Sequence, residues 1–288
     1  MKQKSGNEYV NTYLVIDDRL SFSQFEKMSE VKDKNIGFKN APTEVRKLVF
    51  ELSKGLQKAI NDKLLGLYLY GSLAYNCFNP KISDIDFVVV LSEALTIEEE
   101  QRLAQLHKYL GCESMYGKRL EGTYMTEEQV KTNDYPPDFL YYVEGKEFVK
   151  AKDGQKEQDF PMHRQHLHES GVRIVGYDTQ QLFKPVQWEV LKQSLKQEMT
   201  FIKEQFEERP IYAVLNLCRV VLAHETRGLS SKKQGGEWGL HFLPVKFHEL
   251  IKIGLNGYTS GITDGQKEFL TENLPLFYDY CFERTINN

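Results

Sequence analysis

No run of apolar residues in this chain has the length that crosses a membrane. A transmembrane helix takes about 20 consecutive apolar residues, and the apolar runs among these 288 residues are much shorter. Residues 1–6 carry two lysines, but no apolar segment follows them. We therefore expect neither a membrane span nor a secretory signal peptide.

Cysteine is scarce and scattered. The four cysteines, Cys77, Cys112, Cys218 and Cys281, form no Cys-x-x-Cys motif. This spacing disfavours a disulfide framework and a cysteine zinc cage. We predict free thiols and a cytoplasmic location.

The chain also lacks a basic excess. It has 37 Lys and Arg against 41 Asp and Glu, a net charge of −4. Because a polyanion usually requires a positive surface, this balance disfavours nucleic acid as a partner. Apolar residues make up 41% of the chain and include 16 Tyr and 17 Phe, a composition typical of folded domains with a real core.

Apolar spacing divides the chain into three parts. Residues 1–42 are weakly patterned and form an N-terminal extension, with a short strand or helix within 9–20 and a loop over 33–41. Residues 43–155 alternate helices with strands, and residues 156–288 are helical almost throughout. This order predicts an α+β fold with a C-terminal helical bundle.

Particular elements follow from the same periodicity. In the middle part we predict helices over 43–60, capped by Thr43, and 96–110, with strands over 65–70, 85–91 and 119–126. In the last part we predict four helices, over 187–206, 211–227, 238–255 and 265–285.

Two short motifs carry the chemistry. Gly71-Ser72 ends the strand 65–70, where glycine permits close approach of a ligand and serine offers a hydroxyl. Asp84 and Asp86 open the strand 85–91, and residues i and i+2 of a strand share one face. Two neighbouring carboxylates favour Mg²⁺ together with phosphate oxygens. The combination predicts nucleotidyl transfer.

Glu121 is the candidate third carboxylate, on the strand 119–126. Near the aspartate pair it can accept a proton from an attacking hydroxyl. A third metal ligand and an exposed strand glutamate are the alternatives that the pattern leaves open.

Gly71-Ser72 followed by Ser83-Asp84-Ile85-Asp86 resembles the hallmark of the DNA polymerase β-like nucleotidyltransferases. Residues 43–285 are similar to one branch, the streptomycin/spectinomycin adenylyltransferases. The resemblance implies an N-terminal domain with a mixed β-sheet and flanking helices, ATP as co-substrate and Mg²⁺. It also implies that Ser72 and Ser83 contact phosphate and that Glu121 is the catalytic base.

Three residues of the helical part are assigned by this resemblance alone. Arg219, in Leu215-Asn-Leu-Cys-Arg219, resembles an arginine that reaches the nucleotide phosphates. Lys232 resembles a phosphate-binding lysine, and Tyr258 a tyrosine near the adenosine. A planar guanidinium and a mobile ammonium both suit phosphate.

The chain departs from the branch where streptomycin binds. The stretch 141–146 has no tryptophan for the aromatic residue that packs against the drug. Arg209 stands where the family has a drug-binding aspartate, although Glu207 and Glu208 precede it. These departures disfavour streptomycin and leave an aminocyclitol like spectinomycin, or another hydroxyl-bearing molecule.

The leading hypothesis is AMP transfer from ATP to a hydroxyl of a small acceptor that we expect to be cationic. Two alternatives stay open: transfer to a protein or an RNA end, and a non-catalytic nucleotide-binding module. The sequence does not indicate an oligomeric state. His163, His166 and His168 have spacing that resembles metal ligation, but solvent exposure explains it as well.

Overall fold

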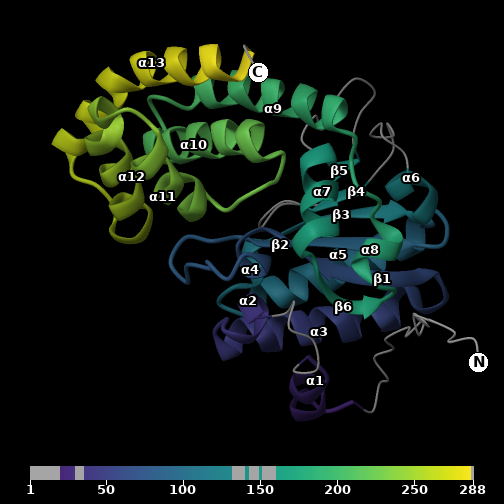
Figure 1. The fold of residues 1–288 in the computed structure, drawn as a ribbon. Helices are drawn as coiled ribbons and strands as arrows, with labels where there is room; N and C mark the ends of the chain where they lie inside the picture. The colour runs from purple at the N-terminus through teal and green to yellow at the C-terminus, as the bar shows by residue number, and fades with distance from the viewer. Residues whose placement is uncertain (1–19, 30–35, 132–139, 143–148, 151–159, 287–288) are drawn as a thin grey trace, which may run out of the picture.

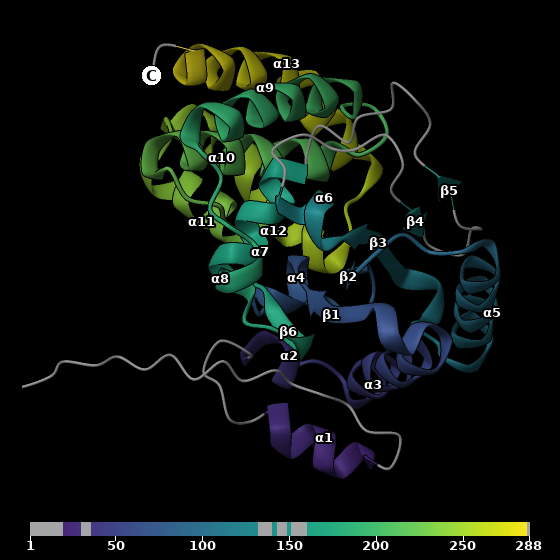
Figure 2. The ribbon, with the colours of Figure 1, turned by 90° about the vertical axis from the view of Figure 1, so that its right-hand side faces the viewer.

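The computed structural model describes residues 20–29, 36–131, 140–142, 149–150 and 160–286. In this part of the chain a β-sheet and a bundle of helices form two halves of the molecule, and helix α7 lies between them (Figures 1 and 2). No helix in the described ranges is long and apolar enough to cross a membrane.

The described strands form one mixed sheet in the order β5-β4-β3-β2-β1-β6. Its strands are β1 (Leu64–Leu69), β2 (Ile85–Leu91), β3 (Leu120–Thr126), β4 (Leu140–Tyr142), β5 (Val149–Lys150) and β6 (Val172–Gly176). β2 and β3 are parallel, and the other neighbouring pairs are antiparallel. A parallel pair needs a crossover, which helix α5 (Ile97–Glu113) supplies. The mixed sheet confirms the predicted fold class.

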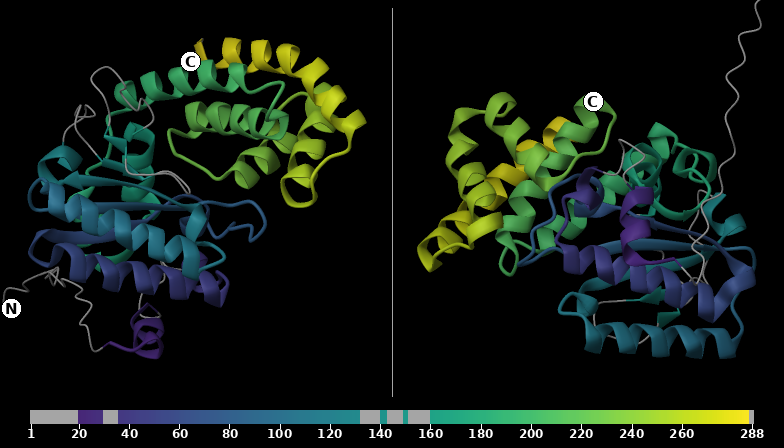
Figure 3. Two further views of the ribbon diagram at one scale, coloured as in Figure 1. Left: turned by 180° about the vertical axis from the view of Figure 1, so that it is seen from behind. Right: turned by 90° about the horizontal axis from the view of Figure 1, so that it is seen from below.

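Both faces of the sheet are covered, which explains the nearly continuous apolar sequence of its central strands. On one face, Leu67 and Phe87 share a core with α3 (Thr43–Ile60) and α5, which lie side by side (Figure 3). On the other face, Tyr68 and Val88 pack with residues of α7 (Phe160–Ser170).

The sheet draws one strand from the part of the chain that sequence analysis assigns to the helical bundle. β6 pairs antiparallel with β1, and Phe160, Leu167 and Phe183 pack on the sheet. One five-residue strand among helices gives a weak periodic signal, which explains why the sequence did not reveal it. Residues 160–183 therefore pack with the sheet, and the bundle's own core begins at α9 (Trp188–Glu204).

The bundle is built around α10 (Pro210–Thr226), whose Leu217 and Val221 are fully buried. The predicted helix over 238–255 is wrong. The structure has α11 (Lys232–Phe242), the 3₁₀ turn η4 (Val245–Phe247) and α12 (His248–Ser260). Pro244 explains the break, because the residue before a proline is forced into extended backbone, and Leu243 has φ −93° and ψ 158°. Helix α13 (Asp264–Ile286) completes the bundle.

The described part of the N-terminal extension packs against α3. It contains α1 (Phe22–Ser29) and the single turn α2 (Ile36–Lys39). Phe25 and Phe38 are buried in the same core as Phe50 of α3. The predicted loop over 33–41 is therefore helical in part, and the element expected within 9–20 falls almost wholly outside the described residues.

The remaining predicted elements agree with α3, α5, β1, β2 and β3 to within three residues. Thr43 is not the cap of α3. Pro42 holds the cap position without a side-chain hydrogen bond, and the Thr43 hydroxyl accepts a hydrogen bond from Arg46. Short elements complete the described chain: α4 (Gly71–Ala74), α6 (Glu127–Lys131), α8 (Thr179–Leu182), and the 3₁₀ turns η2 (Asn61–Lys63) and η3 (Gly117–Arg119).

Candidate active site

The turn between β1 and α4 depends on glycine. Gly71 has φ +63°, a left-handed conformation that other residues rarely adopt. A Cβ at this position would lie 1.8 Å from Oδ2 of Asp86. Glycine thus lets the chain pass directly against the carboxylate, and it places Ser72 beside the start of β2.

Parallel pairing of β2 and β3 brings the predicted carboxylates together. Asp86 and Glu121 are partners in the register of the two strands. Asp84 precedes Asp86 by two residues, so both aspartates lie toward the same side. Glu121 is half-buried next to this pair but is not among the residues that line the cavity described below.

The electrostatics of Asp86 indicate a place for a cation. Burial, followed by the charges of Glu121 and Asp84, raises the pKa of Asp86 to about 7, while His163 and Lys232 oppose the shift. The described residues contain no group of three His, Cys, Asp or Glu placed as a ready metal cage. A pair of carboxylates completed by phosphate oxygens and water is the arrangement that Mg²⁺ takes with nucleotides, and Asp84 and Asp86 fit it.

The facing wall of the site is cationic. The Arg219 guanidinium on α10 is fixed by hydrogen bonds from Nε to the Ser230 carbonyl, 2.8 Å, and from a terminal nitrogen to Asn216, 2.6 Å. Lys232 opens α11, whose cap is Ser231, and its Nζ lies 5.2 Å from the ring centroid of Tyr212. Burial and the neighbouring Arg219 lower the pKa of Lys232.

The loop before β2 connects the two halves. The Ser83 hydroxyl accepts the Asn79 backbone N–H at 2.9 Å. The Asn79 side-chain amide donates to the carbonyl of Tyr258 at 3.1 Å. The Tyr258 hydroxyl in turn contacts Ser83. The centroid of the Tyr258 ring lies 6.0 Å from Nζ of Lys232. These contacts hold α12 against the loop that leads into β2.

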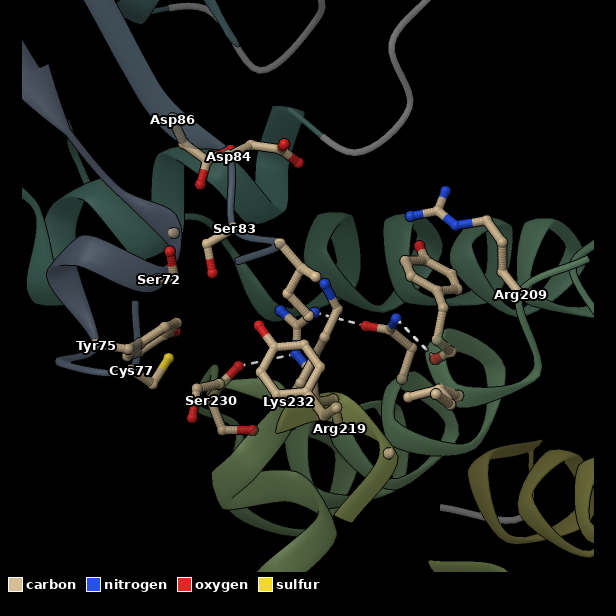
Figure 4. Close-up of a pocket in the computed structure, with 18 of the residues that line it drawn as sticks. Ser72, Tyr75, Cys77, Ser83, Asp84, Asp86, Arg209, Arg219, Ser230 and Lys232 are labelled. Atoms are coloured by element: carbon tan, nitrogen blue, oxygen red, sulfur yellow. Dashed lines mark hydrogen bonds between the residues drawn. The ribbon is translucent and has the colours of Figure 1, made fainter. Parts of the chain in front are cut away.

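A cavity of about 850 Å³ separates the two walls. Asp84 and Asp86 lie on one side and Arg219 and Lys232 on the other (Figure 4). Eight of the nine predicted site residues line this cavity; they are Gly71, Ser72, Ser83, Asp84, Asp86, Arg219, Lys232 and Tyr258. These eight residues come from distant parts of the sequence, and the fold brings them to one cavity. Glu121 lies outside the cavity lining, next to Asp86.

One end of the cavity combines acidic and aromatic side chains, of which sequence reasoning missed Glu198 and Tyr212. The Tyr212 hydroxyl donates to Glu198 at 2.8 Å, and Arg209 stacks on the Tyr212 ring at 4.5 Å. Glu208 also lines this end. Glu198 lies on α9 and Tyr212 on α10, and no local motif in the sequence relates the two.

The other end contains residues that sequence reasoning left without a role. Tyr75 follows α4, and His166 on α7 stacks on it. The three histidines of α7 do not converge on one point, because Nδ1 of His168 bonds the Phe183 carbonyl, whereas His163 and His166 line the cavity. For Tyr75, the position one turn after Ser72 was the available sequence signal.

Comparison with known proteins agrees with this architecture. A nucleotidyltransferase domain model matches residues 51–159, and a model of the aminoglycoside adenylyltransferase C-terminal domain matches residues 181–284. The chain is therefore a nucleotidyltransferase. Together the two matches make the chain similar to the aminoglycoside adenylyltransferases.

Individual relatives have low sequence identity to this chain, but the matches cover most of their length. A spectinomycin 9-adenylyltransferase of Enterococcus faecalis is 24% identical over 81% of this chain and 93% of its own length. A spectinomycin 9-adenylyltransferase of Campylobacter jejuni is 20% identical over 75% of this chain and 86% of its own length. The crystal structure of an Enterococcus spectinomycin adenyltransferase with ATP and spectinomycin has a TM-score of 0.67 and 22% identity, over 83% of this chain and 98% of that one.

Proposed function

We propose that this protein transfers AMP from ATP to a hydroxyl group of an aminocyclitol antibiotic similar to spectinomycin and releases pyrophosphate. The observation that carries the proposal is the cavity in which Asp84 and Asp86 face Arg219 and Lys232, with Glu121 paired to Asp86. This arrangement offers a cation site, a triphosphate site and a base at one place.

The nucleotide would bind between the sheet and the bundle. Arg219 presents a guanidinium already oriented by two hydrogen bonds, and Lys232 adds a second positive charge. Ser72 and Ser83 offer hydroxyls from the opposite wall, and Tyr258 lies where the bundle meets the Ser83 loop. Contacts from both halves would draw them together around the triphosphate.

Asp84 and Asp86 are the residues that would hold Mg²⁺. The ion, when bound, neutralises the triphosphate and stabilises the charge that develops during in-line displacement. Burial, followed by the charges of Glu121 and Asp84, raises the pKa of Asp86, and a cation held between the carboxylates would oppose this shift by favouring their ionised form.

Glu121 would accept the proton of the acceptor hydroxyl. As that proton leaves, the oxygen forms a bond to the α-phosphorus, and the bond from the α-phosphorus to the bridging oxygen breaks. Pyrophosphate departs with the electron pair. The register of β2 and β3 places Glu121 beside Asp86, so base and phosphorus would be neighbours during transfer.

The acceptor would bind at the end of the cavity that contains Glu198, Glu208 and Tyr212. Two carboxylates suit a molecule with protonated amines, and the Tyr212 ring offers an apolar face. Arg209 stacks on the same ring at 4.5 Å. Its guanidinium occupies part of this end and repels a second guanidinium there. This arrangement supports spectinomycin over streptomycin.

A transfer assay with ³²P-labelled ATP tests the proposal. Spectinomycin, streptomycin, a protein mixture and total RNA serve as acceptors, each with and without Mg²⁺. We expect label on spectinomycin alone and only with Mg²⁺. Label on protein or RNA would show that the acceptor is a macromolecule and not an antibiotic. No turnover despite ATP binding would indicate a nucleotide-binding module.

The four free cysteines support a reducing location such as the cytoplasm.

A further inference from the structure

Four buried polar atoms in the cavity have no hydrogen-bond partner among the described residues. They are Oγ of Ser72, OH of Tyr75, Nε2 of His166 and Oγ of Ser230. His166 and Ser230 are only 6% and 8% exposed. Because buried polar groups in folded proteins are nearly always hydrogen-bonded, four such atoms in one cavity indicate a ligand that completes them.

These groups lie at the end opposite the acidic one. Ser72 and Tyr75 project from the sheet side and Ser230 from the bundle, whereas Arg209 lies far across the cavity (Figure 4). The His166 ring stacks on Tyr75 with centroids 3.9 Å apart and planes inclined by 16°. The cluster therefore extends away from Asp86 in the direction opposite to the acceptor end.

The chemistry of the cluster suits an anion. Every member can donate a hydrogen bond, and the positive charge of Arg219 acts on both Tyr75 and His166. Burial, then the charges of Arg219 and His163, holds the pKa of His166 well below its usual range, so the ring serves as a neutral hydrogen-bonding group. His166 also covers one face of Tyr75, which leaves less aromatic surface for a base to stack on.

We propose that Tyr75, His166 and Ser230, together with Ser72, form a pocket for the terminal phosphate of ATP. The assignment rests on the proposed function, in which the α-phosphorus lies near Glu121 and Asp86. The β- and γ-phosphates then extend past Ser72 and Arg219 into the cluster. The pocket senses the length of the phosphate chain and holds the far end of the departing pyrophosphate.

Calorimetry with ATP, ADP and AMP in the presence of Mg²⁺ tests the pocket directly. Tyr75→Phe removes one oxygen and keeps the stacked ring, and His166→Leu removes the imidazole donor. We expect each to weaken ATP binding about tenfold, as the loss of a hydrogen bond to a charged group does, and to change AMP binding less than about twofold. His166→Gln, whose amide can replace Nε2 as donor, should restore most of the ATP affinity.

A matched control comes from the same helix. His168→Gln alters a histidine that bonds the Phe183 carbonyl instead of lining the cavity, and it should leave both nucleotides unaffected. Equal weakening of ATP and AMP by Tyr75→Phe would identify a base or ribose pocket and overturn the proposal, as would unchanged ATP binding. If His166→Leu fails to fold, Tyr75→Phe decides.

Binding of Mg-pyrophosphate separates this inference from the proposed function. We expect Tyr75→Phe to weaken pyrophosphate binding by about the same factor as ATP binding. That result in a protein that adenylylates no acceptor would support the pocket and contradict the proposed reaction. Adenylylation of spectinomycin with pyrophosphate binding unaltered by Tyr75→Phe would contradict the pocket alone.

Discussion

The two walls of the cavity are built in different ways. On the sheet wall, Asp84, Asp86 and Glu121 are fixed by backbone geometry, because strand alternation and the β2–β3 register decide where they lie. On the helical wall, hydrogen bonds to the Ser230 carbonyl and the Asn216 side chain fix Arg219, and Lys232 lies over the Tyr212 ring. We therefore expect substitutions on the sheet wall to cause large losses of turnover. Substitutions on the helical wall should reduce nucleotide binding in smaller steps.

The largest expected effect is on the sheet wall. Asp86→Asn removes a charge from the aspartate pair and should lower turnover by about 10³–10⁵-fold, the range seen when charge stabilisation of a transferred phosphoryl group is lost. Steady-state assays at saturating Mg²⁺ and ATP measure it, with exposed Asp279→Asn as the control. Turnover within about tenfold of wild type would contradict the metal role.

Glu121→Gln should separate the base from the metal pair. The amide keeps the shape but takes no proton, so turnover should fall about 10²–10⁴-fold while Mg-ATP binding persists. Calorimetry of Mg-ATP binding and steady-state turnover measure these, with exposed Glu128→Gln as the control. Loss of ATP binding as severe as in Asp86→Asn would make Glu121 a metal ligand instead.

The helical wall should show graded losses. Arg219→Ala and Lys232→Ala should each reduce the stabilisation that Mg-ATP gives to the fold, and the double variant should nearly abolish it. At a ligand concentration of 100 Kd that stabilisation is about 2.7 kcal/mol. Thermal melts with and without Mg-ATP measure the shift. An undiminished shift in the double variant would show that the nucleotide does not bridge the walls.

The acceptor end should affect only the acceptor. Glu198→Gln keeps a partner for the Tyr212 hydroxyl and removes a negative charge, so we expect the KM for spectinomycin to rise about tenfold. The KM for ATP should stay nearly constant. Exposed Glu204→Gln on the same helix is the matched control. An equal rise in both KM values would place Glu198 outside the acceptor site.

A further effect on the sheet wall concerns stability and pH. The pKa of Asp86 is raised to about 7 from an ordinary 3.8, so the folded protein binds more protons than the unfolded chain between these values. The free energy of unfolding therefore falls as pH rises through this window, by at most about 1.4 kcal/mol for each pH unit. Asp86→Asn should melt higher than wild type at pH 8 without Mg²⁺, and the difference should vanish near pH 4. Thermal melts across this pH range measure it, and a difference that does not change with pH would contradict the raised pKa.

The same comparison explains which parts of the fold were predictable. β2 and its aspartates could be placed from sequence because a β-branched run and an i, i+2 pair are local signals. The break in the predicted helix 238–255 had a local signal too, Pro244, and it was outweighed by the apolar periodicity around it. β6 could not be assigned, because its identity as a strand depends on pairing with β1.

The site divides along the same line. Gly71, Ser72, Asp84 and Asp86 follow from residue types and spacing, and Arg219, Lys232 and Tyr258 from resemblance. Tyr75, His166, Glu198 and Tyr212 came from neither, since each becomes part of the cavity through the packing of a helix. The roles of all these residues, and the domain boundaries after residues 42 and 155, stay predictions.

By itself the sequence determined the reaction class and the placement of Asp84 and Asp86 at the start of one strand. Strand alternation forces Asp84 and Asp86 toward one side, and a glycine is required where the chain touches a carboxylate. Tertiary structure alone decided which polar groups lack partners and which charges surround them. Burial and neighbouring charge are properties of several elements packed together, so the raised pKa of Asp86 and the unpartnered polar atoms of Tyr75 and His166 arise only when α7, α10 and α11 close on the sheet.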